Sequence, residues 1–154
     1  MSLRPILGDF SSIVCFKAVV IGVEETLGAA AAGVALKAAG RKRGHRLVES
    51  LGLAGARPDP SAITAALDAA IGLKGTRLCT VNGVEQGGDG SFIVHLSETI
   101  CSAGEPQGSD RQLTFTLGAV HGAIEALYGV KLRGKQTASV LRGGTYDTVT
   151  LVPA

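Results

Sequence analysis

The chain has few aromatic residues and little charge. Its 154 residues include four Phe, two Tyr and no Trp, and charged residues make up 18%, against about 25% in an average globular protein. Modules that bind single-stranded nucleic acid stack the bases on exposed aromatic rings along a basic groove. The scarcity of rings and a formal net charge of only +2 therefore argue against a nucleic-acid partner.

The chain contains one basic cluster, formed by Arg41, Lys42, Arg43, His45 and Arg46. A cluster of this kind suits phosphates or an anionic surface. It also suits the solvated face of a helix, and we favour this second interpretation because the pattern around the cluster is helical.

Long apolar runs are missing as well. The most apolar stretch, Ile13 to Gly28, is interrupted by Lys17, Glu24 and Glu25, so no segment reaches the roughly 18–20 residues of a membrane span. Residues 1–10 show neither the basic region nor the small-residue cleavage site of a signal peptide. These absences predict a protein without a membrane span.

The sequence has no cysteine motif. Its three cysteines, Cys15, Cys79 and Cys101, are an odd number at wide spacings, which matches neither a disulfide framework nor a zinc-binding pattern. This usage fits the reducing cytosol. We expect a cytoplasmic protein and predict no metal and no cofactor.

The first half of the chain has a helical pattern. One helix is predicted from Ser11 or Ser12 to about Gly28, and a second from about Ala29 to Leu51. A third is predicted to begin after an Asp59 cap, with Pro60 at its first position, and to end at Gly72.

Small residues dominate the stretch Ala29–Ala39 of the second helix. Such a smooth surface allows another helix to approach its backbone closely. We therefore predict a homodimer that is built mainly on the first two helices, through this region.

The second half of the chain combines strands with one helix. Strands are predicted over Arg77–Asn82, Ser91–Ser97, Lys131–Leu141 and Thr145–Val152, and a helix over Gln112–Tyr128 that stops at Gly129. In the second strand Phe92, Val94 and Leu96 share one face. The predicted fold is α+β, a single domain of residues 1–154 with an antiparallel sheet of about four strands, helices packed on one face and long N-terminal helices.

The segment Leu113–Val152 resembles the 4-vinyl reductase (hydrocarbon-binding) domain family. That family shares its fold with heme-based nitric-oxide sensors and with small subunits of the TRAPP transport complex. The resemblance depends on the order and spacing of Gly118, Gly122, Glu125, Leu127, Gly129, Ser139, Arg142, Gly143 and Tyr146, together with the earlier run Ala39–Gly44. It implies a domain that binds a small apolar or tetrapyrrole-like ligand.

The chain departs from this family at three positions. Family members often carry three cysteines thought to hold a metal, and the matching positions here are Leu113, Ser139 and Asp147. Leucine cannot ligate a metal, a serine hydroxyl is a poor zinc ligand, and one carboxylate does not make a site. The resemblance therefore implies that the metal site has been lost.

Five residues are candidates for contacting a ligand: Cys101, Phe115, His121, Ser139 and Asp147. His121 and Glu125 are four apart on one helix, so the carboxylate can orient the imidazole. A Cys101–His121 nucleophile pair is one interpretation, and His121 is also the only reasonable heme ligand. We favour a surface histidine paired on its own helix and a structural, buried cysteine.

The last hairpin has two possible registers. A two-residue turn at Gly143–Gly144 places Ser139 opposite Thr148, and the apolar pattern favours it. A three-residue loop pairs Ser139 with Asp147, and the resemblance favours it because both metal-binding cysteines must have faced the same way. We adopt the second register, which predicts that the Ser139 hydroxyl donates to the Asp147 carboxylate.

These observations support three hypotheses. The first and favoured one is a homodimeric module that binds or senses a small apolar or tetrapyrrole-like ligand. The second is a homodimeric interaction or assembly scaffold without a ligand. The third is an enzyme acting on tetrapyrrole side chains, which only the family name suggests, because the chain shows no evident nucleophile–base pair.

Overall fold

The computed structural model describes residue 6 and residues 12–154. Ser11, one of the two predicted starts of the first helix, and residues 1–5 and 7–10 lie outside the described part. The helices are α1 Ile13–Leu27, α2 Ala29–Ser50, α3 Pro60–Ile71 and α4 Phe115–Tyr128, and the strands are β1 Thr80–Gln86, β2 Phe92–Ser97, β3 Leu132–Ala138 and β4 Asp147–Pro153. No helix among the described residues is long and apolar enough to cross a membrane.

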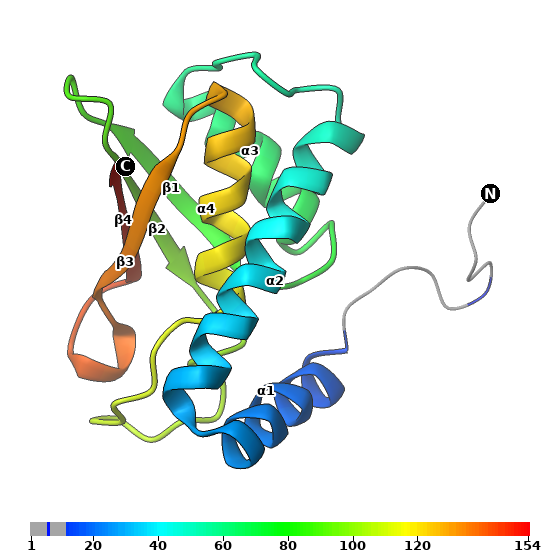
Figure 1. Ribbon diagram of the computed structural model, residues 1–154, viewed down its shortest axis with the longest axis vertical. Helices are drawn as coiled ribbons and strands as arrows, with labels where there is room; N and C mark the ends of the chain where they lie inside the picture. Colours follow the sequence, from blue (N-terminus) through cyan, green and yellow to red (C-terminus); the bar gives the residue numbers. More distant parts are fainter. Residues whose placement is uncertain (1–5, 7–11) are drawn as a thin grey trace.

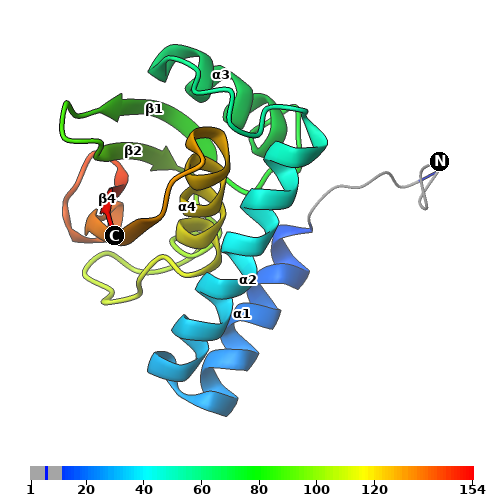
Figure 2. The same ribbon diagram turned by 45° about the horizontal axis from the view of Figure 1, so that its top comes forward.

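The four strands form one antiparallel sheet in the order β1-β2-β4-β3. The helices lie on one side of this sheet (Figures 1 and 2). Helix α4 lies next to the sheet, α2 crosses the outer side of α4, and α1 runs beside α2, as Figure 2 shows. The predicted α+β class, with about four strands and helices on one face, is confirmed.

Local signals place the helix ends as predicted. The Asp59 side chain accepts a hydrogen bond from the Ala62 N–H at 3.0 Å, and Pro60 opens α3 because its missing N–H needs no partner there. Helix α4 ends at Gly129, whose φ of 64° lies in the left-handed region that favours glycine.

Strand β2 shows the alternation that its sequence predicts. Phe92, Val94 and Leu96 are buried and belong to the main core. The intervening His95 is half-buried and hydrogen-bonded to Glu85 and Thr148. One face of the sheet therefore packs against the helices, and the other is partly open to solvent.

The prediction for the first strand was wrong at both ends. Arg77 has a φ of 57°, and the N–H groups of Leu78 and Cys79 donate to the Ile71 carbonyl. These residues complete the end of α3, so β1 begins at Thr80. It then continues to Gln86, four residues beyond the predicted end at Asn82.

The last hairpin follows neither predicted register over its full length. Strand β3 ends at Ala138, which pairs with Thr148, and residues Val140–Arg142 form a short 3-10 turn. The Ser139 side chain accepts a hydrogen bond from the Leu141 N–H at 3.2 Å. The chain therefore turns away from the sheet before a Ser139–Asp147 pair forms, and the predicted bond between these two side chains is not made.

The closest contact between helices is the crossing of α2 and α4. Two glycines on each helix make it: Gly40, Gly44, Gly118 and Gly122. A Cβ on Gly122 would lie 2.0 Å from the carbonyl oxygen of Arg41, and one on each of the other three would lie 2.1 Å from a carbonyl oxygen of the facing helix. No side chain fits in such a space, so the two backbones touch.

The small residues of Ala29–Ala39 are not the ones that make this crossing. Ala32 and Leu36 are buried with Val20 of α1, whereas most alanines of the stretch are exposed and Val34 is 72% exposed. A close backbone contact does form on α2, but it begins only at Lys37, near the end of the predicted stretch, and its partner is α4 of the same chain.

Candidate functional site

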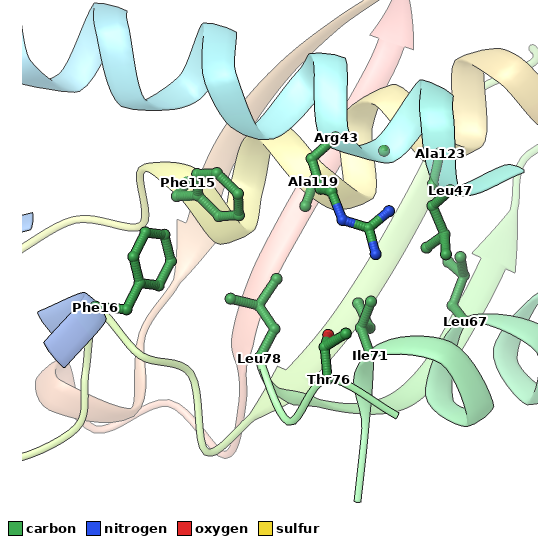
Figure 3. Close-up of a pocket in the computed structure, with 11 residues that line it drawn as sticks. Phe16, Arg43, Leu47, Leu67, Ile71, Thr76, Leu78, Phe115, Ala119 and Ala123 are labelled. Atoms are coloured by element: carbon green, nitrogen blue, oxygen red, sulfur yellow. The ribbon is translucent and has the colours of Figure 1, made fainter. Parts of the chain in front are cut away.

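A cavity of about 220 Å³ lies among the helices. We call it the helix pocket. Most of its wall is apolar: Phe16, Leu47, Leu67, Ile71, Leu78 and Phe115. These side chains come from α1, α2, α3, the segment after α3, and α4, and they converge on one space (Figure 3).

Residue spacing on α4 explains why the pocket is open. Phe115, Ala119 and Ala123 are four apart and therefore lie on one helix face, where all three line the pocket. On the adjacent face the glycines hold α2 in backbone contact. Because Ala119 and Ala123 carry only methyl groups, the space beside that contact is not filled.

Helix α1 closes one end of the pocket. The rings of Phe16 and Phe115 meet edge to face, with centroids 4.9 Å apart, as Figure 3 shows. Lys17 holds the helix there, donating to the Cys101 carbonyl at 2.7 Å and pairing with Glu105 at 2.7 Å. Both of these residues belong to the loop that precedes α4, so Lys17 fixes α1 to that loop.

Two polar side chains line the pocket, Arg43 from α2 and Thr76 from the segment after α3. In Figure 3 the Arg43 guanidinium extends into the space above Thr76 and Ile71. Neither polar side chain forms a hydrogen bond or ion pair with any residue in the described part of the chain. The pocket thus combines an apolar wall with an unpaired cation.

A second polar site lies on the neighbouring side of the α2–α4 crossing. Glu125 of α4 is 1% exposed, and its carboxylate accepts from Arg41 Nε at 2.7 Å and from the Leu132 N–H at 2.8 Å. His45 Nε2 lies 3.1 Å from the same carboxylate. One buried side chain therefore connects α2, α4 and β3.

These contacts set the protonation of the site. Burial raises the pKa of Glu125, but the hydrogen bonds from Arg41, the Leu132 N–H and His45 outweigh that effect, and the pKa falls to about 2. Burial lowers the pKa of His121, against the attraction of Glu125. Glu125 is therefore ionised, and the lowered pKa of His121 favours its neutral form. These protonation states suit a site that holds α2, α4 and β3 together.

The structure does not bring the five predicted ligand-contact residues together. Phe115 lines the helix pocket, and Cys101, His121, Ser139 and Asp147 are not among its lining residues.

His121 is buried, so the expectation of a surface histidine was wrong; its Nε2 lies 2.9 Å from the Leu132 carbonyl oxygen and 3.5 Å from Glu125. Cys101 is buried as expected, with its sulfur 3.7 Å from the Thr114 hydroxyl. The two side chains have different partners.

Asp147 is fully buried at the start of β4. Its carboxylate accepts from the hydroxyls of Thr99 and Ser102, both at 2.7 Å, and from the Val140 N–H at 3.1 Å. These donors take the place that the prediction gave to the Ser139 hydroxyl. No group of three or more His, Cys, Asp or Glu side chains in the described part is placed to hold a metal ion.

Sequence reasoning missed the pocket residues Arg43, Leu47, Leu67 and Ile71. Each has an ordinary place in a helical pattern, and Arg43 belonged to a cluster that we assigned to a solvated helix face. The available signal was the spacing of Gly40 and Gly44, which implies a helix in backbone contact and therefore places the neighbouring positions 43 and 47 next to that contact.

The fold is known in other proteins. No model of a known family matches this chain, and no curated protein matches it in sequence. The phenol-responsive sensory domain of the transcription activator PoxR, solved with phenol, matches with a TM-score of 0.67 and 14% identity over 94% of this chain and 75% of that one. A trafficking protein particle complex subunit 3 from Naegleria fowleri, covalently bound to palmitic acid, matches with a TM-score of 0.58 and 14% identity over 93% of this chain and 97% of that one.

At 14% identity these likenesses concern the fold alone. The chain has the fold of a sensory domain and of a transport-complex subunit, which is the fold that the sequence resemblance implies.

Proposed function

We propose that this chain is a binding or sensory module for a small apolar molecule, which it holds in the helix pocket. The observation that carries the proposal is an apolar cavity of about 220 Å³ inside the helical layer. The two proteins of similar fold support it, because one was solved with phenol and the other with palmitic acid.

The volume of the pocket restricts the ligand. Pockets for drug-sized molecules span about 300–1,000 Å³, and an apolar cavity of about 150 Å³ accepts benzene. At about 220 Å³ the helix pocket suits one substituted ring or a short alkyl chain. This size favours the small apolar ligand of the prediction over a tetrapyrrole.

The ligand of this pocket is held without a covalent bond. No cysteine is among the lining residues; Cys79 and Cys101 are buried and Cys15 is exposed. Burial raises the pKa of the Cys79 thiol to about 12, so it is not a nucleophile at neutral pH. Of the five predicted contact residues we retain Phe115 as a ligand contact, and the roles of the other four stay predictions.

Titration with phenol, followed by NMR of methyl-labelled protein, tests the proposed function. We expect saturable shifts of the Leu47, Leu67 and Ile71 methyl signals, because these residues line the pocket, and little change at the exposed Leu73. Native mass spectrometry of protein from its own host should show a small bound molecule. Phenol shifts spread over the surface, or none at millimolar concentration, would contradict the proposal.

We also propose that the chain forms a homodimer through α1 and α2. The supporting observation is the exposed apolar surface there, where Val34 is 72% exposed and Val14 on α1 is 80% exposed. A stable interface should bury about 1,000 Å² or more in total. A dimer that carries no ligand would favour the alternative function, an interaction scaffold.

Light scattering at micromolar concentration tests the dimer. We expect Val34→Glu to give a monomer, since a buried unpaired carboxylate opposes association. Leu73→Glu is the matched control, because Leu73 is 75% exposed and lies outside both helices. A wild-type monomer, or a dimer that Val34→Glu leaves intact, would contradict the proposed interface.

A further inference from the structure

We propose that the ligand of the helix pocket is a small amphipathic carboxylate, with its apolar part against the leucines and its carboxylate on Arg43. This inference rests on the proposed function and adds the chemical class of the ligand. Its starting point is that Arg43 extends into an apolar space (Figure 3) and has no polar partner among the described residues.

Two basic neighbours of Arg43 on α2 have a partner within the chain. Arg41, two residues earlier, is paired with Glu125, and His45, two residues later, contacts the same carboxylate. No acidic residue is among those that line the helix pocket. A guanidinium beside an apolar wall is stabilised when an anion pairs with it. No described residue supplies that anion to Arg43, so we assign it to the ligand.

The polar groups in the pocket match one carboxylate. A guanidinium offers two parallel N–H donors in a planar fork that fits the two oxygens of a carboxylate. The Thr76 hydroxyl, which lies below the guanidinium in Figure 3, is an additional donor. One cation and one hydroxyl suit a monoanion better than a phosphate dianion, which needs more donors.

The rest of the pocket determines the apolar part. Leu47, Leu67, Ile71 and Leu78 lie beside and below Arg43 in Figure 3, and the Phe16–Phe115 pair lies at one end. A carboxylate on Arg43 therefore leaves a wholly apolar space for the remainder of the molecule. The cavity of about 220 Å³ admits a phenyl ring with a short chain, so aryl-alkanoic acids and short fatty acids are the predicted class.

The test compares two probes of one shape, 3-phenylpropanoate and the neutral 3-phenylpropanol, by isothermal titration calorimetry at pH 7. We expect the carboxylate to bind at least about tenfold more tightly, as a charge-assisted hydrogen bond implies. Arg43→Met should remove most of this difference while leaving the affinity for the alcohol nearly unchanged, because methionine retains the apolar stem. Thr76→Val should remove a smaller part of it.

Two controls make the result specific. Arg46→Met causes the same loss of charge on the same helix at an exposed residue, and it should leave both affinities unchanged. Arg43→Lys should keep part of the preference, since the charge remains but the planar fork is lost. Thermal unfolding of each variant shows whether it is folded before it is titrated.

The outcomes separate this inference from the proposed function. If the alcohol binds and the carboxylate binds no better, the pocket is functional and the carboxylate proposal is wrong. An equal loss of affinity for both probes in Arg43→Met would also overturn it, because Arg43 would then act by stacking on the ring or by packing. If neither probe binds but phenol does, this inference alone fails; if phenol does not bind either, the proposed function fails with it.

Discussion

The two sides of the α2–α4 crossing differ in how the space between the helices is filled. On one side Gly40, Gly44, Gly118 and Gly122 bring the backbones into contact, and Glu125 joins both helices to β3. On the other side the same helices, with α1 and α3, surround a cavity of about 220 Å³. A single pair of helices thus provides both a backbone-to-backbone contact and part of the wall of an apolar pocket.

This difference shows how a small fold can keep a cavity. An empty apolar space loses dispersion contacts and is therefore unfavourable. A rigid contact beside it prevents the walls from collapsing to fill the space. We expect substitutions on the glycine side to act on folding and substitutions on the pocket side to act on binding, and the following predictions test that separation.

The largest effect is expected for Gly122→Ala. The added Cβ would lie 2.0 Å from the Arg41 carbonyl oxygen, and a backbone atom cannot move away as a flexible side chain can. We expect a loss of about 3 kcal/mol or more in the free energy of unfolding, measured by urea denaturation.

Gly22→Ala in α1 is the matched control for this glycine. A Cβ there meets nothing within 4 Å, so the change should stabilise the protein by about 0.5–1 kcal/mol through helix propensity. If both variants lost stability equally, the backbone contact would not be the reason.

A smaller effect is expected for Glu125→Gln, which removes the charge that Arg41 and His45 contact. We expect it to cost about 2–3 kcal/mol at pH 7, at the lower end for a buried pair because the Arg41 side chain is 39% exposed. Glu85→Gln is the control, since Glu85 is 66% exposed although it also contacts a histidine, and its effect should be within about 1 kcal/mol.

The shifted pKa of Glu125 also predicts how the stability of the protein depends on pH. The pKa of Glu125 is lowered to about 2 from an ordinary 4.5, so its stabilising contribution is present above pH 4.5 and is lost as the pH falls toward 2. The wild-type protein should lose stability across that interval. In Glu125→Gln the loss should be smaller; an identical pH profile for the two proteins would show that Glu125 is not the group responsible.

The smallest effect on stability is expected for Ala119→Leu on the pocket side. The larger side chain enters existing space, so the free energy of unfolding should change by no more than about 1 kcal/mol. Binding of phenol should be abolished, because the added atoms occupy the ligand's volume. A stable Ala119→Leu protein that still binds phenol at Leu47 and Leu67 would place the ligand elsewhere.

Local signals in the sequence predicted much of the fold. The Asp59–Pro60 start, the Gly129 stop and the alternation of Phe92, Val94 and Leu96 depend on neighbouring residues only, and all three are confirmed. The predicted start of β1, at Arg77, was wrong because Leu78 and Cys79 hydrogen-bond to the end of α3 instead of to a strand. That choice depends on where α3 ends in space, which strand propensity does not report.

The site was predicted less well than the fold, for a related reason. Phe115 was predicted as a ligand contact and does line the pocket, whereas Arg43 was assigned to a solvated face. The periodicity of α2 indicates which residues face inward but not whether they meet packed atoms or empty space. Membership in the 4-vinyl reductase family also stays a prediction, because the solved structures establish the fold alone.

By itself, the sequence determined the α+β class, the helix ends and the inward face of β2, because each depends on contacts within a few residues or on a single periodicity. The tertiary structure alone decided that Glu125 would connect α2 to β3 and that Arg43 would enter an apolar cavity. The residues around that cavity run from Phe16 to Ala123 along the chain. A cavity is the space left between elements. The spacing of Gly40 and Gly44 signals that some helix lies close to α2, but which helix it is, and what space remains beside it, depend on contacts between distant segments.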